Sequence, residues 1–294
     1  MHYVIGDVHG CFDDMIALLE KIEAKDKDAR FIFVGDFVDK GDKVKETVEW
    51  CIKNISGNGK YQSVIGNHEW MVLEWFEQWF GEMYGVKSEK NVYPWYEKYC
   101  PLSEEMNWWE PEDWKDFIGL FRTMPFYKTV TIKSIWGKNV TYRLVHAFFD
   151  YDWPVDPKKR LDAYMWLRPS EPKVDEKEIL VHGHTPTIFP DFFKGDFGDI
   201  KPGMISYRKN EINVDGGCMA AGYYPYPCML CAICLESLEE IYPYSLEERL
   251  GSINPENMYF HKKLMRAEEY REIFMRNESP SKKQMLRRLG CPAA

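Results

Sequence analysis

Three stretches decide the fold: residues 2–10 read HYVIGDVHG, residues 31–42 read FIFVGDFVDKGD and residues 62–69 read QSVIGNHE. Each is a short apolar run that passes directly into a polar, glycine-containing loop. Between them, residues 11–22 carry apolar side chains at helical spacing, and residues 44–52 form a second helix candidate. This alternation predicts parallel strands joined by crossover helices.

The composition indicates a folded protein without bulk affinity for nucleic acid or membranes. The chain has 294 residues, of which 45% are hydrophobic and 29% charged, so it is too apolar to be disordered and fits one or two domains. Its net charge of −9 gives no attraction to nucleic acid duplexes or anionic lipid, and no apolar stretch reaches the ~20 residues of a membrane helix. No signal peptide precedes the first predicted strand, so we expect a cytoplasmic protein with reduced cysteines.

Residues 70–125 differ from the strand–helix pattern before them. They hold seven of the 11 Trp, and residues 75–83 and 111–121 are predicted helices. We therefore expect a helical insertion whose rings form a small core of their own.

Strands return after the insertion and give way to a helical tail. A hairpin is predicted from two alternating runs, and three further short strands follow; the five segments are residues 126–136, 140–145, 179–182, 212–214 and 229–235. From residue 245 the pattern is helical, with apolar contacts expected from Leu264, Met265, Ile273 and Phe274. We predict a main domain of residues 1–244 and a helical C-terminal extension of residues 245–294.

Five predicted strands end in loops rich in Asp, His, Asn and Gly. These loops begin at Gly6, Gly35, Gly66, His146 and His182. Ligand sites in open α/β sheets lie at the carboxyl ends of the strands, so the five loops are expected to converge. Carboxylate and imidazole ligands suit Mn, Fe or Zn, and the loops contain no Cys for a thiolate site. Two such ions about 3.5–4 Å apart can activate a water and bind a phosphoryl group.

The order of the five motifs resembles that of a known family. The sequence reads Gly-Asp-x-His-Gly, Gly-Asp-x-Val-Asp-x-Gly, Gly-Asn-His-Glu, a strand-borne His and Gly-His-Thr-Pro, over roughly residues 1–235. This pattern is similar to the calcineurin-like metallophosphoesterase superfamily, and most similar to its bacterial and phage phosphoprotein-phosphatase branch, which includes the symmetrical diadenosine tetraphosphate hydrolases. The resemblance implies a four-layer α/β/β/α sandwich of two mixed sheets, with residues 1–244 as the catalytic domain and residues 70–125 as an insertion near the metal site.

The resemblance also implies the role of each site residue. The first divalent metal ion would be bound by Asp7, His9 and Asp36. Asp36 would bridge to a second ion, which Asn67, His146 and His184 would also bind. A metal-bridging hydroxide would then attack phosphorus directly, with Mn²⁺ as the expected metal and Fe or Zn as alternatives.

His68 and Asp39 are the expected catalytic pair. His68 would protonate the leaving oxygen, while Asp39 would accept a hydrogen bond from it, orient the ring and keep it cationic.

Substrate phosphate needs positive charge, and here the chain departs from the family pattern. Lys40 stands where the family has Arg, Asp42 where Pro is usual, and Ile65 where many protein phosphatases have Arg. Lys40 can bind phosphate as a point charge but cannot form a bidentate pair. Arg168, in Trp166-Leu167-Arg168, is the expected bidentate phosphate ligand.

Other polar residues have simpler explanations. His182 is expected to pack at the end of its strand, Asp215 to stabilise a turn, and Asp150 and Asp152 to lie in a solvated loop. The spacing Cys228-x-x-Cys231-x-x-Cys234 admits an iron–sulfur or zinc site, but it lies in an apolar run, which favours buried thiols. The basic residues of 262–294 are expected on a solvated helix face or a flexible end, with docking of a partner or a polyphosphate as the alternative.

Three functions are compatible with these residues. The first is a dinuclear-metal hydrolase of phosphate esters, similar to serine/threonine phosphatases, acting on a phosphoprotein. The second is a symmetrical dinucleoside tetraphosphate hydrolase, in which the aromatic insertion would stack on a base. The third is a catalytically weak metal-binding interaction module, supported only by Lys40 and Ile65. His68 and Asp39 argue against the third, because a binding module needs no acid for a leaving group.

Overall fold

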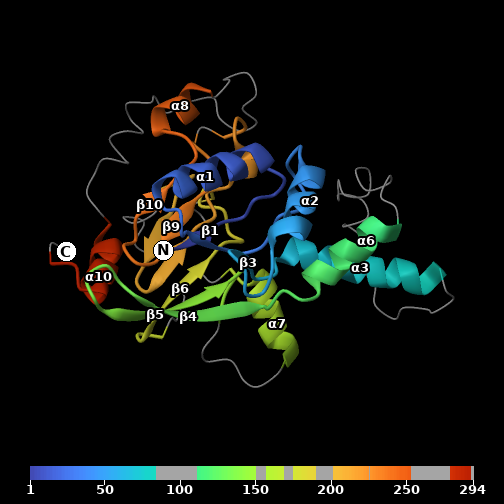
Figure 1. Ribbon diagram of the computed structural model, residues 1–294, viewed down its shortest axis with the longest axis horizontal. Helices are drawn as coiled ribbons and strands as arrows, with labels where there is room; N and C mark the ends of the chain where they lie inside the picture. The colour runs from blue at the N-terminus through green and yellow to red at the C-terminus, as the bar shows by residue number, and fades with distance from the viewer. Residues whose placement is uncertain are drawn as a thin grey trace.

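The computed structural model describes residues 1–83, 111–149, 157–168, 175–189, 201–224, 226–252 and 279–292, which form two five-stranded mixed sheets with helices around them (Figure 1). The first sheet has the order β10 (Glu240–Ile241), β9 (Ala232–Cys234), β1 (His2–Ile5), β2 (Arg30–Phe33) and β3 (Tyr61–Ser63). The second has the order β4 (Tyr127–Lys133), β5 (Asn139–Val145), β6 (Glu178–His182), β8 (Glu211–Asn213) and β7 (Ser206–Arg208). The prediction of two mixed sheets is confirmed.

The strands that carry the polar loops run parallel within each sheet. Strands β1, β2 and β3 pair in parallel, and so do β5, β6 and β8, whereas β4, β7, β9 and β10 pair antiparallel. Strands β7 and β10 were not predicted, because each has only two or three residues. Strand β9 is shorter than the predicted 229–235.

Alternation along β1 and β2 explains how the first sheet is buried on both faces. Side chains of consecutive strand residues point to opposite faces. Tyr3 and Ile5 therefore join the core beneath the helices, while Val4 joins the core between the sheets. The inter-sheet core is completed from the second sheet by Tyr142, Leu144, Val181 and Ile212.

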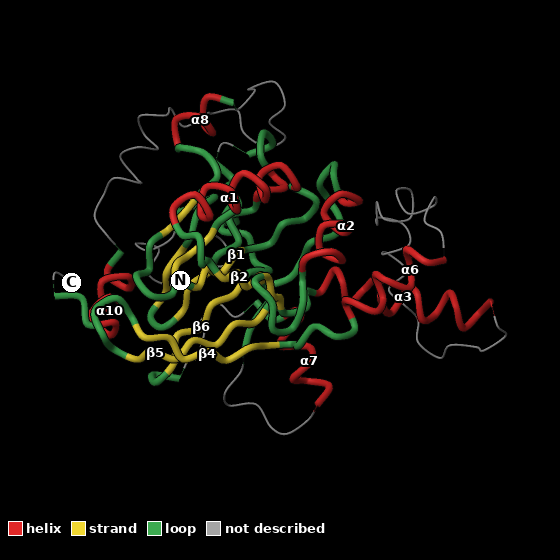
Figure 2. Tube along the Cα trace, viewed as in Figure 1, coloured by secondary structure: helices red, strands yellow, loops and turns green. Residues whose placement is uncertain are grey.

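Helices cover the outer face of the first sheet (Figure 2). They are α1 (Phe12–Lys25) and α2 (Val44–Asn54), whereas α3 (Asn67–Met83) and α6 (Pro111–Phe121) extend to one side of the sheet, beyond α2. Helix α1 buries Met15, Leu18, Leu19 and Ile22, which recur every three or four residues as predicted. On the second sheet, Tyr164 and Leu167, in and just after α7 (Pro157–Trp166), pack against Val145 and Leu180.

The described Trp rings of the insertion join the main core, which corrects for these rings the expectation of a separate one. Trp70, Trp75 and Trp114 all pack against the cluster that contains α1 and β1. Trp75 and Trp114 lie 5.8 Å apart between ring centroids. The physical reason is that α3 begins directly at the third polar loop, and the Pro125 carbonyl after α6 accepts a hydrogen bond from Ile65 N (3.0 Å), so both helices are fixed to the first sheet. The side chains of Trp79, Trp95, Trp108 and Trp109 lie outside the described residues.

The last helix of the chain packs against the sandwich. The tail contains α8 (Leu246–Gly251) and α10 (Pro280–Leu289), and α10 lies beside β5 in Figure 1. Met285, Leu286 and Leu289 are buried in the inter-sheet core, while Arg287 is exposed, which agrees with basic residues on a solvated face of this helix. The predicted contacts Leu264, Met265, Ile273 and Phe274, as well as Asp150 and Asp152, lie outside the described residues.

The seven cysteines within the described ranges are free thiols. Cys228, Cys231 and Cys234 are buried, as the buried-thiol interpretation predicts. Among the helices that the structure places, none combines the length and hydrophobicity needed to cross a membrane.

Candidate metal centre

All six predicted metal ligands lie at the carboxyl ends of parallel strands. Asp7 and His9 follow β1, Asp36 follows β2, and Asn67 begins α3 after β3. His146 directly follows β5, and His184 follows β6. All six are buried. Potential metal-ligand atoms come together in two groups at this edge, both of which include Asp36.

The first convergent group contains His146, His184 and Asp36, whose ligand atoms lie within 4.8 Å of one another. Asn67 completes it: its Oδ1 lies 2.7 Å from His146 Nε2 and 3.0 Å from His184 Nδ1. Asp36 Oδ1 lies 3.4 Å from His146 Nε2. These four residues are the set that was predicted to bind the second metal ion.

Hydrogen bonds to backbone carbonyls decide which imidazole nitrogen faces this group. His146 Nδ1 donates to Val34 O (2.9 Å), and His184 Nε2 donates to Trp166 O (3.3 Å). Burial lowers the pKa of both histidines well below the usual value, so both rings are neutral. His146 Nε2 and His184 Nδ1 therefore carry lone pairs and no hydrogen, and both face the carbonyl oxygen of Asn67. Three acceptors cannot form hydrogen bonds with one another, but all three can bind one cation.

The second convergent group contains His9, Asp36 and His68, with ligand atoms again within 4.8 Å. His9 Nδ1 donates to Val38 O (2.8 Å), which turns Nε2 toward Asp36 Oδ2 at 3.4 Å. Asp36 therefore directs Oδ2 to this group and Oδ1 to the other. This is the geometry required of a bridging carboxylate.

Asp7 lies beside these groups with one uncompensated oxygen. Its Oδ2 accepts a hydrogen bond from His184 N (2.9 Å), while Oδ1 is buried without a hydrogen-bond partner. Burial raises the pKa of Asp7 well above the usual value, and the carboxylates of Asp215 and Asp36 raise it further. An unpartnered buried carboxylate oxygen next to other carboxylates is stabilised by a cation, so the donor set fits two divalent ions.

The predicted pair of His68 and Asp39 is formed. His68 Nδ1 lies 2.5 Å from Asp39 Oδ2, and His68 Nε2 points to the centre, 3.9 Å from Asp36 Oδ2. Burial lowers the pKa of His68, and the effect of Asp39 does not outweigh it. Desolvation and the cations Lys40 and Arg168 lower this pKa, while Asp39 raises it, and the expectation that Asp39 keeps the ring cationic stays a prediction.

Both predicted phosphate-binding cations border the centre. Lys40 Nζ lies 2.9 Å from His9 Nε2. Arg168 Nη2 donates to His184 O (3.1 Å), and its side chain is exposed. Both cations are thus close to the candidate ligands, with Arg168 accessible from solvent.

The backbone of the polar loops is strained where the candidate ligands lie. Five non-glycine residues of the centre have left-handed φ angles: His9 (46°), Asp36 (55°), Asp39 (68°), Lys40 (73°) and His184 (64°). This region is uncommon for residues with a Cβ atom, and such strain clusters at functional sites. The loops are therefore shaped to direct side chains into the centre at a cost to local stability.

Glu69 holds this strained loop and was given no role from the sequence. Its buried carboxylate accepts four backbone hydrogen bonds, from Asp36 N (2.8 Å), Gly66 N (3.0 Å), Phe37 N (2.7 Å) and Val38 N (3.2 Å). A Cβ on Gly66 would come within 2.1 Å of Asp36 Oδ1, so only glycine allows this approach. The signal in the sequence was the acidic residue directly after Gly-Asn-His.

His182 and Asp215 support the loops, as expected. His182 Nε2 lies 2.8 Å from the buried carboxylate of Glu211. Asp215 Oδ1 accepts from Gly217 N (2.9 Å) and stabilises the turn after β8.

Comparisons with known proteins agree with this geometry. The model of the calcineurin-like phosphoesterase family matches residues 3–214. The chain therefore belongs to the calcineurin-like phosphoesterase family, whose members use divalent metals.

Curated relatives match only part of their length. A symmetrical bis(5'-nucleosyl)-tetraphosphatase of Psychromonas ingrahamii is 32% identical over 132 residues, which are 45% of this chain and 43% of that protein. A protein of the same name from Neisseria gonorrhoeae is 40% identical over 72 residues, covering 24% of this chain and 25% of the relative. The matched stretches thus span less than half of these relatives.

The solved structure of a putative diadenosine tetraphosphatase has the same fold. It superimposes with a TM-score of 0.51 at 16% identity, over 82% of this chain and 91% of that one.

Proposed function

We propose that this chain hydrolyses dinucleoside tetraphosphates symmetrically, with two divalent cations bound at the centre described above. The observation that carries the dinuclear chemistry is Asp36, whose two carboxylate oxygens face two separate groups of ligands. The names of the relatives from Psychromonas and Neisseria support the choice of substrate over a phosphoprotein. The serine/threonine-phosphatase-like activity remains the second candidate, because the same centre is suited to both substrates.

The ligands proposed for the two ions are the six predicted residues. The ions would be held by Asp7, His9, Asp36, Asn67, His146 and His184, and we favour Mn²⁺ because the donors are nitrogen and oxygen. When bound, the two ions would activate a water and neutralise phosphate charge. The free thiols of the described cysteines are in keeping with the proposed cytoplasmic location.

The chain's own groups would do the remaining work. Lys40 and Arg168 would bind phosphate oxygens, with Arg168 able to form two parallel hydrogen bonds. Asp39 would fix the His68 ring through Nδ1, which leaves Nε2 to deliver a proton to the leaving oxygen. Since burial lowers the pKa of His68, phosphate bound nearby would be needed to favour the protonated ring.

A substrate panel tests this proposal. Metal-stripped protein is supplied with Mn²⁺ and assayed on diadenosine tetraphosphate, a phosphoserine peptide, p-nitrophenyl phosphate and bis-p-nitrophenyl phosphate. We expect ADP as the sole nucleotide product from the dinucleotide, at a higher kcat/KM than the peptide, and no turnover by the control Asp36→Asn. AMP plus ATP would refute symmetrical cleavage, and turnover of the peptide alone would favour the phosphatase.

A further inference from the structure

A pocket next to the metal centre is not used by the chemistry described so far. It has a volume of about 350 Å³ and lies between the start of α1, the second polar loop and the segment after β8. Lys40, Gly41 and Asp42 form the wall that it shares with the centre. Because the Lys40 ammonium lies 2.9 Å from His9 Nε2, a ligand in this pocket would be separated from the metal ligands by one side chain.

The lining combines exposed aromatic surface with charges that are mostly paired. Tyr223 is 53% exposed, and Phe12 also lines the pocket. Asp13 forms an ion pair with Lys43 (2.6 Å), and Asp14 forms one with Arg249 of the C-terminal extension (2.8 Å). Two of the pocket's carboxylates are therefore neutralised.

We propose that this pocket binds the nucleoside of a nucleotide whose phosphates lie at the metal centre, with the base stacked on Tyr223. The volume falls in the range of small-molecule sites, and an exposed aromatic ring is a sequence-tolerant platform for a base. Lys40, on the shared wall, faces the phosphates that join the nucleoside to the reacting phosphorus, and the Asp42 carboxylate is an acceptor for ribose hydroxyls. This inference rests on the proposed function, because it assumes a nucleotide substrate.

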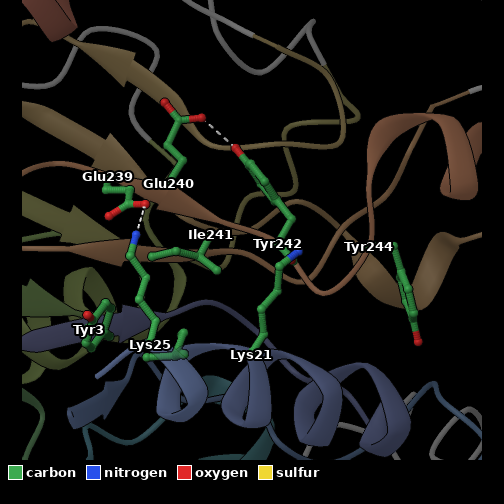
Figure 3. Close-up of a pocket in the computed structure, with 9 residues that line it drawn as sticks. Tyr3, Lys21, Lys25, Glu239, Glu240, Ile241, Tyr242 and Tyr244 are labelled. Atoms are coloured by element: carbon green, nitrogen blue, oxygen red, sulfur yellow. Dashed lines mark hydrogen bonds and ion pairs between the residues drawn. The ribbon is translucent and has the colours of Figure 1, made fainter. Parts of the chain in front are cut away.

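A second cavity among the described residues is a less suitable candidate. It has about 220 Å³ and is lined by the second half of α1 and residues 239–244 (Figure 3). Its two lysines already have partners: Lys25 pairs with Glu239, and Lys21 Nζ donates to Tyr242 O (2.8 Å). It also shares none of the candidate ligand loops.

Product inhibition separates the nucleoside pocket from the phosphate site. The inhibitors are ADP and inorganic diphosphate, which has the same two phosphates but no nucleoside, and the reporter is hydrolysis of p-nitrophenyl phosphate by the full chain with excess Mn²⁺. We expect the wild type to bind ADP more tightly than diphosphate. Tyr223→Ala should raise the inhibition constant of ADP about 5- to 100-fold and change that of diphosphate less than about 2-fold.

Tyr223→Phe is the matched control, because it keeps the ring and should keep the preference for ADP. An equal rise for both inhibitors in Tyr223→Ala, or a wild type that does not prefer ADP, would overturn the proposal. Turnover of diadenosine tetraphosphate is measured on the same preparations. If the preference for ADP depends on Tyr223 but diadenosine tetraphosphate is not cleaved, the result supports nucleoside binding in this pocket. It then rejects only the proposed substrate.

Discussion

Replacing Glu69 with Gln tests how the strained loop is held, because it exchanges one oxygen for an amino group at nearly constant volume. In the structure Oε2 accepts from Asp36 N and Gly66 N, and Oε1 accepts from Phe37 N and Val38 N, at 2.7–3.2 Å. A Gln side chain has only one acceptor oxygen. Whichever way the amide points, two of the four buried N–H groups lose their acceptor.

The expected loss of stability follows from these two donors. Each unsatisfied buried N–H costs about 1–3 kcal/mol, so two cost about 2–6 kcal/mol. Part of this loss is offset, because the buried Glu69 carboxylate carries a desolvation cost, which also raises its pKa. The neutral Gln amide does not carry this cost. We expect a net loss of about 2–4 kcal/mol out of the roughly 5–15 kcal/mol typical of a folded protein. The freed groups belong to the loop of Asp36 and Asp39, so metal affinity should fall as well.

Denaturant unfolding of metal-free protein measures the loss of stability, and the metal content after dialysis measures the loss of metal affinity. Glu77→Gln is the control on the same helix, because Glu77 is exposed and its ion pair with Arg122 (2.7 Å) lies at the surface. Exposed pairs contribute little, so we expect the control to change stability by less than about 1 kcal/mol. If Glu69→Gln is as stable as the control and still binds two metal ions, Glu69 does not hold the loop.

Three further predictions concern the centre itself. His68→Asn should retain both metal ions and lower turnover of a substrate with a poor leaving group by about 10²- to 10⁴-fold, whereas loss of metal would make His68 a ligand, as its position near His9 and Asp36 allows. Arg168→Ala should raise KM for phosphate esters, and an unchanged KM would remove it from the substrate site. In metal-free protein burial raises the pKa of Asp7 and Asp36, so these two carboxyls keep protons that they release in the unfolded chain, and their contribution to stability falls as pH rises above about 4. Thermal unfolding should therefore show metal-induced stabilisation that grows from about pH 5 to about pH 8, and a constant increment would contradict this linkage.

The parallel strands and the site residues were predictable for the same physical reason. Strands β1 and β2 are buried on both faces after their first residue, so residues 3–5 and 31–33 are apolar runs, and the polar residues that follow them stand out in the sequence. Because parallel strands end at one edge, Asp7, Asp36 and Asn67 had to lie near one another. The chemistry of Asp and His then limited the site to a few metals.

Other features were beyond the sequence because they depend on partners far along the chain. The short strands β7 and β10 carry too few residues for a periodic pattern and exist through pairing with β8 and β9. The sequence also predicts a separate core for the Trp residues of the insertion, since nothing local indicates that Trp70, Trp75 and Trp114 join the core that contains residues of α1 and β1.

By itself, the sequence determined which residues would end the strands, and hence the metal-binding chemistry, since apolar runs and loop composition are local properties. Only the tertiary structure decided that Glu69 accepts hydrogen bonds from the second loop, that burial lowers the pKa of His68, and that Tyr223 and Lys40 line the same pocket. Desolvation, backbone hydrogen bonding and pocket shape all depend on which distant segments meet. These interactions therefore appear only once the chain is folded.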